Sequence, residues 1–169
     1  TEIHGKTWGI IGLGAIGRRV AEIARAFGAK VIYYSASGAP AQEGYEQVDF
    51  ETLLTQSDII SVHAPLNEHT EGLINSKAFE KMKSSCIFLN LGRGPIVDEQ
   101  ALYNALVRNQ IAAAGLDVLC EEPMSADNPL LKLKDSKRLL ITPHIAWASV
   151  EARTHLMEII HGQVKDFFA

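Results

Sequence analysis

The chain has 169 residues and a formal net charge of −4, with 47% hydrophobic and 21% charged residues. These values are typical of a single globular domain that buries a sizeable core. The sequence has no basic run and no apolar run as long as a membrane span, so we expect neither a nucleic-acid partner nor a membrane protein. Its two cysteines, Cys86 and Cys120, fit a reducing cytosol, and we expect a cytoplasmic protein.

Apolar, strand-like runs alternate with helical patterns along the whole chain. We expect strands at residues 6–11, 30–34, 59–63, 86–91, 112–118 and 139–142. The polar segment 35–45 and the segment 121–137, which contains two prolines, are expected to be loops.

Helix signals lie between these strands. Hydrophobic residues at positions 16, 20, 23 and 27 recur at helical spacing after the first strand. Residues that cap helices open four further segments, and we expect helices that begin at Asp49, at Asn75 or Ser76, at Asp98 and at Ser149. The last of these carries one apolar stripe, formed by Leu156, Ile159, Ile160, Val164 and Phe167.

Strands that are apolar on both faces, separated by helices or long crossovers, indicate a parallel sheet covered on both sides. The predicted fold class is therefore α/β, with a doubly wound parallel sheet. The sequence shows no repeat at a solenoid period and no internal domain boundary. We therefore expect residues 1–169 to form one domain.

A glycine-rich turn, Gly12-Leu13-Gly14-Ala15-Ile16-Gly17, stands between the first strand and the first helix. Gly12 permits a tight turn, Gly14 lets a pyrophosphate approach the backbone, and Gly17 lets the helix pack closely on the strand. The start of the helix then offers free N–H groups to phosphates. The alternative is a merely structural turn, but the strand before it and the helix after it favour a bound dinucleotide.

The residue that would bind the adenosine ribose does not discriminate between cofactors. An acidic residue at the end of the second strand would indicate NAD, and a nearby Arg would indicate NADP. Ser35 stands there instead and is followed by Ala36, Ser37 and Gly38. Ser35 can bond a ribose hydroxyl or a phosphate, or it can be a plain turn residue, so NAD and NADP both stay open.

Three ionisable residues, Arg93, Glu122 and His144, each follow a different predicted strand. The carboxyl ends of parallel strands meet at one edge of a sheet, so we expect these side chains to lie together. An Arg can bind a carboxylate through its two-pronged guanidinium, and a His beside a Glu can transfer a proton near neutral pH. Taken singly, each has a plain alternative as an exposed loop residue or a strand end. Together they favour catalysis on a small keto or hydroxy acid.

With these residues in view, the chain resembles the D-isomer-specific 2-hydroxyacid dehydrogenases. The resemblance rests on five stretches in the family's order, at residues 5–14, 62–66, 89–94 with 97–98, 115–118 with 122–123, and 142–147. It covers nearly the whole chain but only one of the family's two domains. It implies that residues 1–169 are a Rossmann-like dinucleotide-binding domain, that the substrate domain is absent from this chain, and that the domain alone does not turn over substrate.

The resemblance implies a role for each ionisable residue. His144 would give a proton to the substrate oxygen during reduction and take it back during oxidation. Glu122 would hydrogen-bond His144 and favour its charged form; Glu121 is the rival, but the family motif places the carboxylate directly before proline. Arg93 would bind the substrate carboxylate and polarise its carbonyl group.

The resemblance also implies the remaining contacts of the cofactor. Asp117 would bind the nicotinamide carboxamide, although a cap is the alternative, and His63 would be a cofactor-wall or structural residue. Trp147 either lines the mouth of the substrate site or packs beneath the last helix. No residues have convincing metal-ligand spacing. The full expected cofactor set is Gly12, Gly14, Ala15, Ile16, Gly17, Ser35, His63, Ala64, Pro65, Thr70, Leu91, Gly92, Asp117 and Ala146.

The function implied is hydride transfer between NAD or NADP and a small D-2-hydroxy or 2-keto acid. The His-Ile-Ala-Trp-Ala ending is similar to glycerate dehydrogenases and hydroxypyruvate reductases, a weaker hint about the substrate. The alternative is a non-catalytic, NAD(H)-responsive binding protein of the corepressor type on the same scaffold. Related enzymes dimerise through this domain, so we expect a homodimer.

Overall fold

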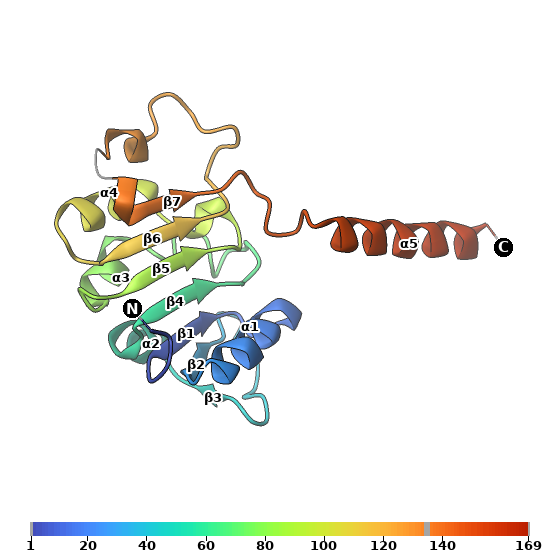
Figure 1. Ribbon diagram of the computed structural model, residues 1–169, viewed down its shortest axis with the longest axis horizontal. Helices are drawn as coiled ribbons and strands as arrows, with labels where there is room; N and C mark the ends of the chain where they lie inside the picture. Colours follow the sequence, from blue (N-terminus) through green and yellow to red (C-terminus); the bar gives the residue numbers. More distant parts are fainter. Residues whose placement is uncertain (1, 134–135, 169) are drawn as a thin grey trace.

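The computed structural model describes residues 2–133 and 136–168 and contains one seven-stranded sheet in which every pair of neighbouring strands is parallel (Figure 1). The strand order is β3-β2-β1-β4-β5-β6-β7. The order reverses between β1 and β4, the point at which open α/β sheets bind ligands beyond the carboxyl ends of the strands. The strands are β1 (Thr7–Ile11), β2 (Lys30–Tyr34), β3 (Glu46–Gln47), β4 (Ile59–Val62), β5 (Ile87–Asn90), β6 (Ala113–Leu116) and β7 (Leu139–Ile141).

The described residues contain five α-helices and three short 3-10 helices, and all of them except α5 lie between strands in the sequence. The α-helices are α1 (Ala15–Ala26), α2 (Phe50–Gln56), α3 (Ser76–Lys81), α4 (Glu99–Val107) and α5 (Val150–Phe167). The 3-10 helices are η1 (Gly94–Ile96), η2 (Pro129–Lys132) and η3 (Ser136–Arg138). None of the helices in the described part of the chain has the length and apolar character needed to cross a bilayer.

The predicted doubly wound α/β fold is confirmed, and so are the six predicted strands, β2 at the expected bounds and the other five at slightly shorter ones. The predicted helix starts are confirmed as well, because Asp49, Asn75, Asp98 and Ser149 each accept a hydrogen bond from a main-chain N–H in the first turn. Strand β3 is not among the strands predicted from the sequence. This strand has only two residues and no hydrophobic alternation, so tertiary pairing with β2 alone defines it.

Two separate cores lie on the two faces of the sheet. The larger core joins α2, α3 and α4 to the strands and contains Ile11, Phe79 and Phe88 among its fully buried side chains. The smaller core lies under α1 and is centred on Ile10 and Tyr33.

Helix α1 forms where the hydrophobic spacing predicts it, but a different face is buried. Gly17, Ala21 and Ala24 are its buried residues, whereas Ile16 and Phe27 are more than half exposed. Small residues let the helix lie close to the strands. The larger apolar residues are therefore left on the outer surface.

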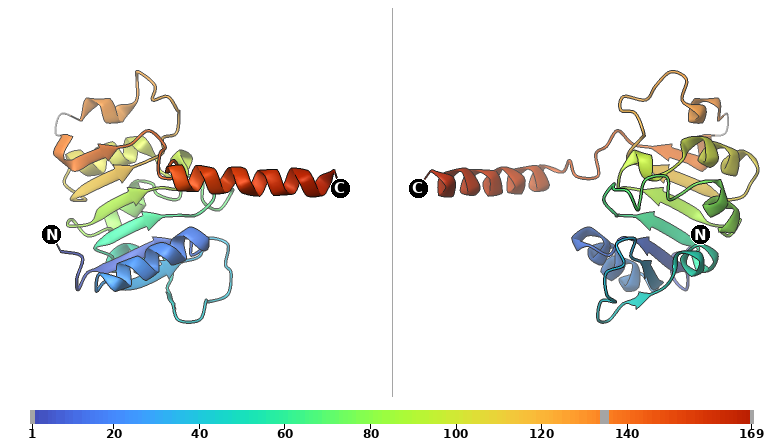
Figure 2. Two further views of the ribbon diagram at one scale, coloured as in Figure 1. Left: turned by 45° about the vertical axis from the view of Figure 1, so that its right-hand side comes forward. Right: turned by 180° about the vertical axis from the view of Figure 1, so that it is seen from behind.

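Helix α5 extends away from the sheet, and none of its residues is buried (Figures 1 and 2). Its predicted apolar stripe is present in the sequence but packs against nothing in the described chain, and Ile160 and Val164 are exposed. The predicted cover on both sides of the sheet is also incomplete at the β7 end. Leu140 of β7 is 67% exposed, and alternate residues of β5 and β6 are only partly buried.

Candidate active site

The glycine turn after β1 has the geometry that only glycine tolerates at two of its three positions. Gly12 has a φ of 92°, and a Cβ there would lie 2.7 Å from the main-chain nitrogen of Ala64. A Cβ on Gly17 would overlap the carbonyl oxygen of Gly12. By contrast, a Cβ on Gly14 would meet nothing within 4 Å, so the chain itself does not require glycine there. Open space above Gly14 fits a ligand that approaches the backbone.

Helix α1 differs from the other α-helices of the described chain at its N-terminus. Gly14 is its N-cap and provides no side-chain hydrogen bond, and no acidic residue lies in its first turn. The other four have a side-chain cap. The first N–H groups of an uncapped helix need acceptors and carry partial positive charge. They fit a pyrophosphate, which supplies both oxygens and negative charge.

A cavity of about 270 Å³ lies beside this turn. It brings together seven residues of the expected cofactor set: Gly12, Gly14, Ser35, His63, Ala64, Pro65 and Thr70. The side chains of Ala15 and Ile16 are exposed on α1, so these two residues can contribute only main-chain N–H groups to a phosphate. Thr70 is 1% exposed, and its hydroxyl donates to the carbonyl of Pro65 at 2.7 Å, so it holds the shape of the wall.

Gln42 and Asn67 also line this cavity, and the sequence analysis did not single them out. The Gln42 amide donates to the carbonyl of Leu13 at 2.8 Å and so fastens the 35–45 loop to the glycine turn. Because the contact of Gln42 joins residues far apart in the sequence, no local pattern could have revealed it.

His63 is part of a hydrogen-bonded chain that begins inside the sheet. The Trp8 indole N–H donates to the Ser61 hydroxyl at 2.9 Å, and that hydroxyl lies 3.1 Å from Nε2 of His63. Burial lowers the pKa of His63 to about 4, so the ring is neutral at pH 7. Its Nδ1 is the one buried side-chain nitrogen or oxygen in the described residues without a hydrogen-bond partner. These properties fit a wall of the cofactor cavity and not an acid–base group.

The turn that carries Arg93 follows β5 and is held by a buried amide. Asn90 is 1% exposed; its oxygen accepts the N–H of Gly92 at 3.1 Å, and its NH₂ group donates to the carbonyl of Arg93 at 3.0 Å. The Arg93 guanidinium donates to the carbonyl of Gly92 at 2.8 Å and is otherwise exposed. A Cβ on Gly94 would overlap the carbonyl of Leu119, so this turn touches the loop that carries Glu122.

Glu122 and His144 form the hydrogen-bonded pair that the sequence predicts. Oε2 of Glu122 lies 2.9 Å from Nδ1 of His144, and both side chains are about two-fifths exposed, at 39% and 38%. The Leu119 N–H donates to Oε1 of Glu122 at 2.9 Å. That hydrogen bond and then the one from His144 hold the pKa of Glu122 below its ordinary value. The carboxylate is therefore charged and oriented at neutral pH.

Asp117 follows β6 and accepts three hydrogen bonds from the segment that carries His144. Its oxygens accept the Thr142 hydroxyl at 2.6 Å and the N–H groups of Ile145 and Ala146 at 2.9 and 2.8 Å. Burial raises the pKa of Asp117, but these hydrogen bonds and the nearby His144 outweigh it, and the net shift is downward. Asp117 therefore holds this segment as a carboxylate, and the main-chain N–H of Ala146 is already occupied.

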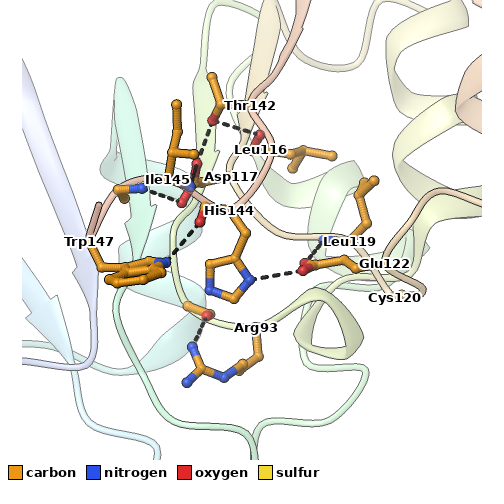
Figure 3. A network of polar contacts seen from close by, with 12 residues as sticks. Arg93, Leu116, Asp117, Leu119, Cys120, Glu122, Thr142, His144, Ile145 and Trp147 are labelled. Carbon is orange, nitrogen blue, oxygen red and sulfur yellow. Dashed lines mark hydrogen bonds and ion pairs between the residues drawn. The ribbon is translucent and has the colours of Figure 1, made fainter. Parts of the chain in front are cut away.

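Figure 3 shows Arg93, Glu122 and His144 gathered in one cluster, each from the loop that follows a different strand of the sheet. Nδ1 of His144 faces Glu122, while the other ring nitrogen points toward the space between Arg93 and Trp147. A largely apolar cavity of about 620 Å³ adjoins the cluster and is lined by Asp117, Leu119, Glu122, Met124 and His144 among others. A smaller pocket beside it includes Leu91 and Asp117. Gly92 lies in the turn after β5, directly before Arg93.

Acidic residues, histidines and cysteines do not cluster as a metal site in the described residues.

Comparison with known proteins identifies a matching family and several similar proteins. Residues 1–146 match the family described as D-isomer specific 2-hydroxyacid dehydrogenase, NAD binding domain. A hydroxypyruvate reductase of Blautia hydrogenotrophica is 46% identical over 168 residues, which cover 98% of this chain and 51% of the relative.

Two solved structures share the fold closely. D-lactate dehydrogenase from Aquifex aeolicus, complexed with NAD and lactic acid, superposes with a TM-score of 0.90 at 32% identity over 99% of this chain and 55% of that one. The acyclic imino acid reductase Bsp5, in complex with NADPH and D-Arg, gives a TM-score of 0.89 at 41% identity over 99% of this chain and 52% of that one.

The chain thus spans about half the length of the relatives it matches. The family match, the parallel sheet and the uncapped glycine turn all agree with the expectation drawn from the sequence. The chain belongs to the D-isomer specific 2-hydroxyacid dehydrogenase family, of which it is an NAD-binding domain.

Proposed function

We propose that this chain is the nucleotide-binding part of an NAD(P)-dependent D-2-hydroxyacid dehydrogenase. The observation that carries the proposal is the 2.9 Å pair of Glu122 and His144, beside the Arg93 turn and at the same edge of the sheet as the uncapped glycine turn. A nicotinamide cofactor supplies the hydride when it is bound. The protein supplies the proton, the charge that fixes the substrate, and the orientation of both.

His144 would act through Nε2, because Nδ1 is engaged by Glu122. During reduction, the hydride is added to the keto carbon and the proton on Nε2 passes to the keto oxygen, which gives the hydroxyl. Oxidation reverses both transfers. Glu122 fixes the orientation of the ring, and the proton transfer by His144 contributes roughly 10²–10⁴-fold to the rate.

Arg93 would bind the substrate carboxylate, since a guanidinium stays charged and presents two parallel donors. Its position beside the free ring nitrogen of His144 supports this role (Figure 3). The substrate would then lie between Arg93 and His144, where the carboxylate is anchored and the neighbouring oxygen faces the imidazole.

The nicotinamide end of the cofactor would lie near Asp117. Each carboxylate oxygen can accept about two hydrogen bonds. One oxygen of Asp117 accepts two and the other accepts only the Ala146 N–H. One acceptor position therefore remains for the carboxamide NH₂, and Leu91, Gly92 and Ala146 would border the ring.

We infer that the domain binds NADH and NADPH with similar affinity. Ser35 lies in the cofactor cavity, where its hydroxyl is 3.3 Å from that of Ser37, and no charged residue lines this cavity. Titration by Trp fluorescence tests this, because Trp8 is joined to the cavity wall through Ser61 and His63. A preference of more than about tenfold for either cofactor, about 1.4 kcal/mol, would contradict it.

The substrate proposed is a small 2-keto acid such as hydroxypyruvate, with glycerate as the reduced product. The test is oxidation of NADH or NADPH by hydroxypyruvate in the full-length parent enzyme. His144→Gln in that enzyme should lose turnover and keep cofactor affinity. Intact cofactor binding without turnover of any 2-keto acid would instead favour a non-catalytic NAD(H)-responsive protein.

We also propose that the substrate-binding domain lies in the remainder of the parent protein, that this domain alone does not turn over substrate, and that the parent works in the cytoplasm as a homodimer. Cys86 and Cys120 are both free thiols, which suits a reducing compartment.

The exposed residues Ile16, Ile23 and Phe27 on one face of α1 give an apolar surface suited to self-association. Sedimentation of wild type and Ile23→Glu checks the dimer, and a monomeric wild type would exclude it.

A further inference from the structure

His144 lies in a turn that a residue with a side chain rarely adopts. Its φ is 53°, in the left-handed region, and Asn109 is the other non-glycine residue of the described chain with a positive φ. A β-carbon is crowded in this region, so such a conformation persists only where the surroundings fix it. The position of the imidazole therefore depends on whatever holds the turn.

The main chain on both sides of the imidazole is held by hydrogen bonds. The N–H of His144 donates to the carbonyl of Thr142 at 3.0 Å. The next two N–H groups, of Ile145 and Ala146, donate to Asp117. All three N–H groups after Pro143 are thus engaged within the turn itself or by the carboxylate at the end of β6.

The carbonyl oxygen of His144 is also engaged, and an indole binds it. The Nε1–H of Trp147 donates to this oxygen at 2.9 Å, although the ring itself is 53% exposed (Figure 3). An exposed Trp that uses its N–H in this way adds little to the core. Its hydrogen bond instead gives the turn a second attachment besides Asp117.

We propose that Asp117 and Trp147 are positioning residues that clamp the left-handed turn of His144 and thereby aim its Nε2 at the substrate oxygen. The Thr142 hydroxyl, which donates to Asp117 at 2.6 Å, belongs to the same clamp. This inference rests on the proposed role of His144 in proton transfer. It adds a task for Asp117 besides any contact with the cofactor, and it assigns Trp147 to the turn and not to packing beneath α5.

The clamp can be tested in this chain without cofactor or substrate. Amide hydrogen exchange, followed by NMR, reads the N–H groups of Ile145 and Ala146 directly. Asp117→Asn should raise at least one of the two exchange rates at least tenfold, because an amide offers one acceptor oxygen where the carboxylate offers two. Thr142→Val removes only the hydroxyl and should raise them less, while Thr142→Ser restores the hydroxyl and should match wild type.

Asp49→Asn is the matched control, because it makes the same chemical change at the cap of α2 and Asn also caps helices well. It should leave exchange at Ile145 and Ala146 unchanged. If Asp117→Asn also leaves these rates within twofold of wild type, the clamp does not exist.

The catalytic consequence is measured in the parent enzyme with Trp147→Phe, which keeps an aromatic ring and removes the indole N–H. A displaced imidazole should lower kcat roughly 10–100-fold while KM for the keto acid changes less than threefold. A change confined to KM would mean that Trp147 only lines the substrate mouth. If the parent shows no turnover at all, the proposed function fails, and the exchange data still decide whether the clamp holds the turn.

Discussion

Gly94 lies directly against the carbonyl group of Leu119, with no room for a β-carbon between them. The turn after β5 and the loop after β6 therefore meet main chain to main chain. This contact holds the Arg93 turn beside the loop from which Glu122 reaches His144. The glycine matters for how closely the two loops approach, since no positive φ accompanies it.

Gly94→Ala should separate these loops. We expect the free energy of unfolding to fall by about 1–3 kcal/mol, as for other overpacked sites, and the chemical shifts of Leu119 and Cys120 to move. Chemical denaturation and NMR check this. Gly162→Ala, in the exposed helix α5 with open space around it, is the matched control and should be neutral or slightly stabilising. Equal behaviour of the two variants would show that the loops tolerate the added methyl group.

Glu122 should titrate below the ordinary value of about 4.3, and two hydrogen bonds should share the effect unequally. The main-chain N–H of Leu119 lowers the pKa of Glu122 most, and the hydrogen bond from His144 comes second. His144→Gln should therefore return the carboxyl only part of the way to its ordinary pKa. Carbon-13 NMR of the Glu122 carboxyl measures both titrations. A complete return would mean that His144 alone sets the shift.

His63 should make the domain less stable as the pH falls from about 6.5 to about 4. Burial lowers its pKa to about 4 in the folded protein, so in this range the unfolded chain binds a proton that the folded chain does not. Between pH 7 and pH 5 we expect about 1–2 kcal/mol of stability to be lost through this group. Urea unfolding at both pH values should show a smaller loss for His63→Gln. His155→Gln, at an exposed position on α5, should follow wild type.

Neither cysteine should react readily. The pKa of Cys86 is raised to about 12 by burial, and that of Cys120 to about 11 by burial and then by Glu99. Because the thiolate is the reactive form, Cys120 should be alkylated by iodoacetamide at pH 8 about 100-fold more slowly than an ordinary cysteine. Mass spectrometry follows the modification. Glu99→Gln should speed it severalfold, and an unchanged rate would leave burial as the sole cause.

The parts of the fold that follow from local sequence were predictable, and the reason is physical. A cap such as Asp98 bonds the N–H of Ala101 three residues on, so the signal and its partner lie in one short window. The glycine turn could be predicted for the same reason, because its three glycines lie within six residues. The expected meeting of Glu122 and His144 followed from one topological fact, that carboxyl ends of parallel strands share an edge.

Other contacts between residues that are far apart in the sequence could not be predicted. Asp117 bonds Ile145 and Ala146, 28 and 29 residues further on, and nothing near Asp117 in the sequence shows that it has these partners. Likewise, the spacing of Ile16 and Phe27 predicts a helix but not which side faces the sheet. That choice was decided by Gly17 and two alanines, which fit against the strands where larger side chains do not.

Helix α5 has 18 residues and no buried side chain, and neither core of the sheet includes any of its residues. A lone helix of this length is only marginally stable in water. Proteases should therefore cut the chain within or just before this helix and spare the sheet. A shortened protein that ends near Ala148 should melt at nearly the same temperature. It should also be more soluble, because it lacks the exposed apolar residues Leu156, Ile160 and Val164.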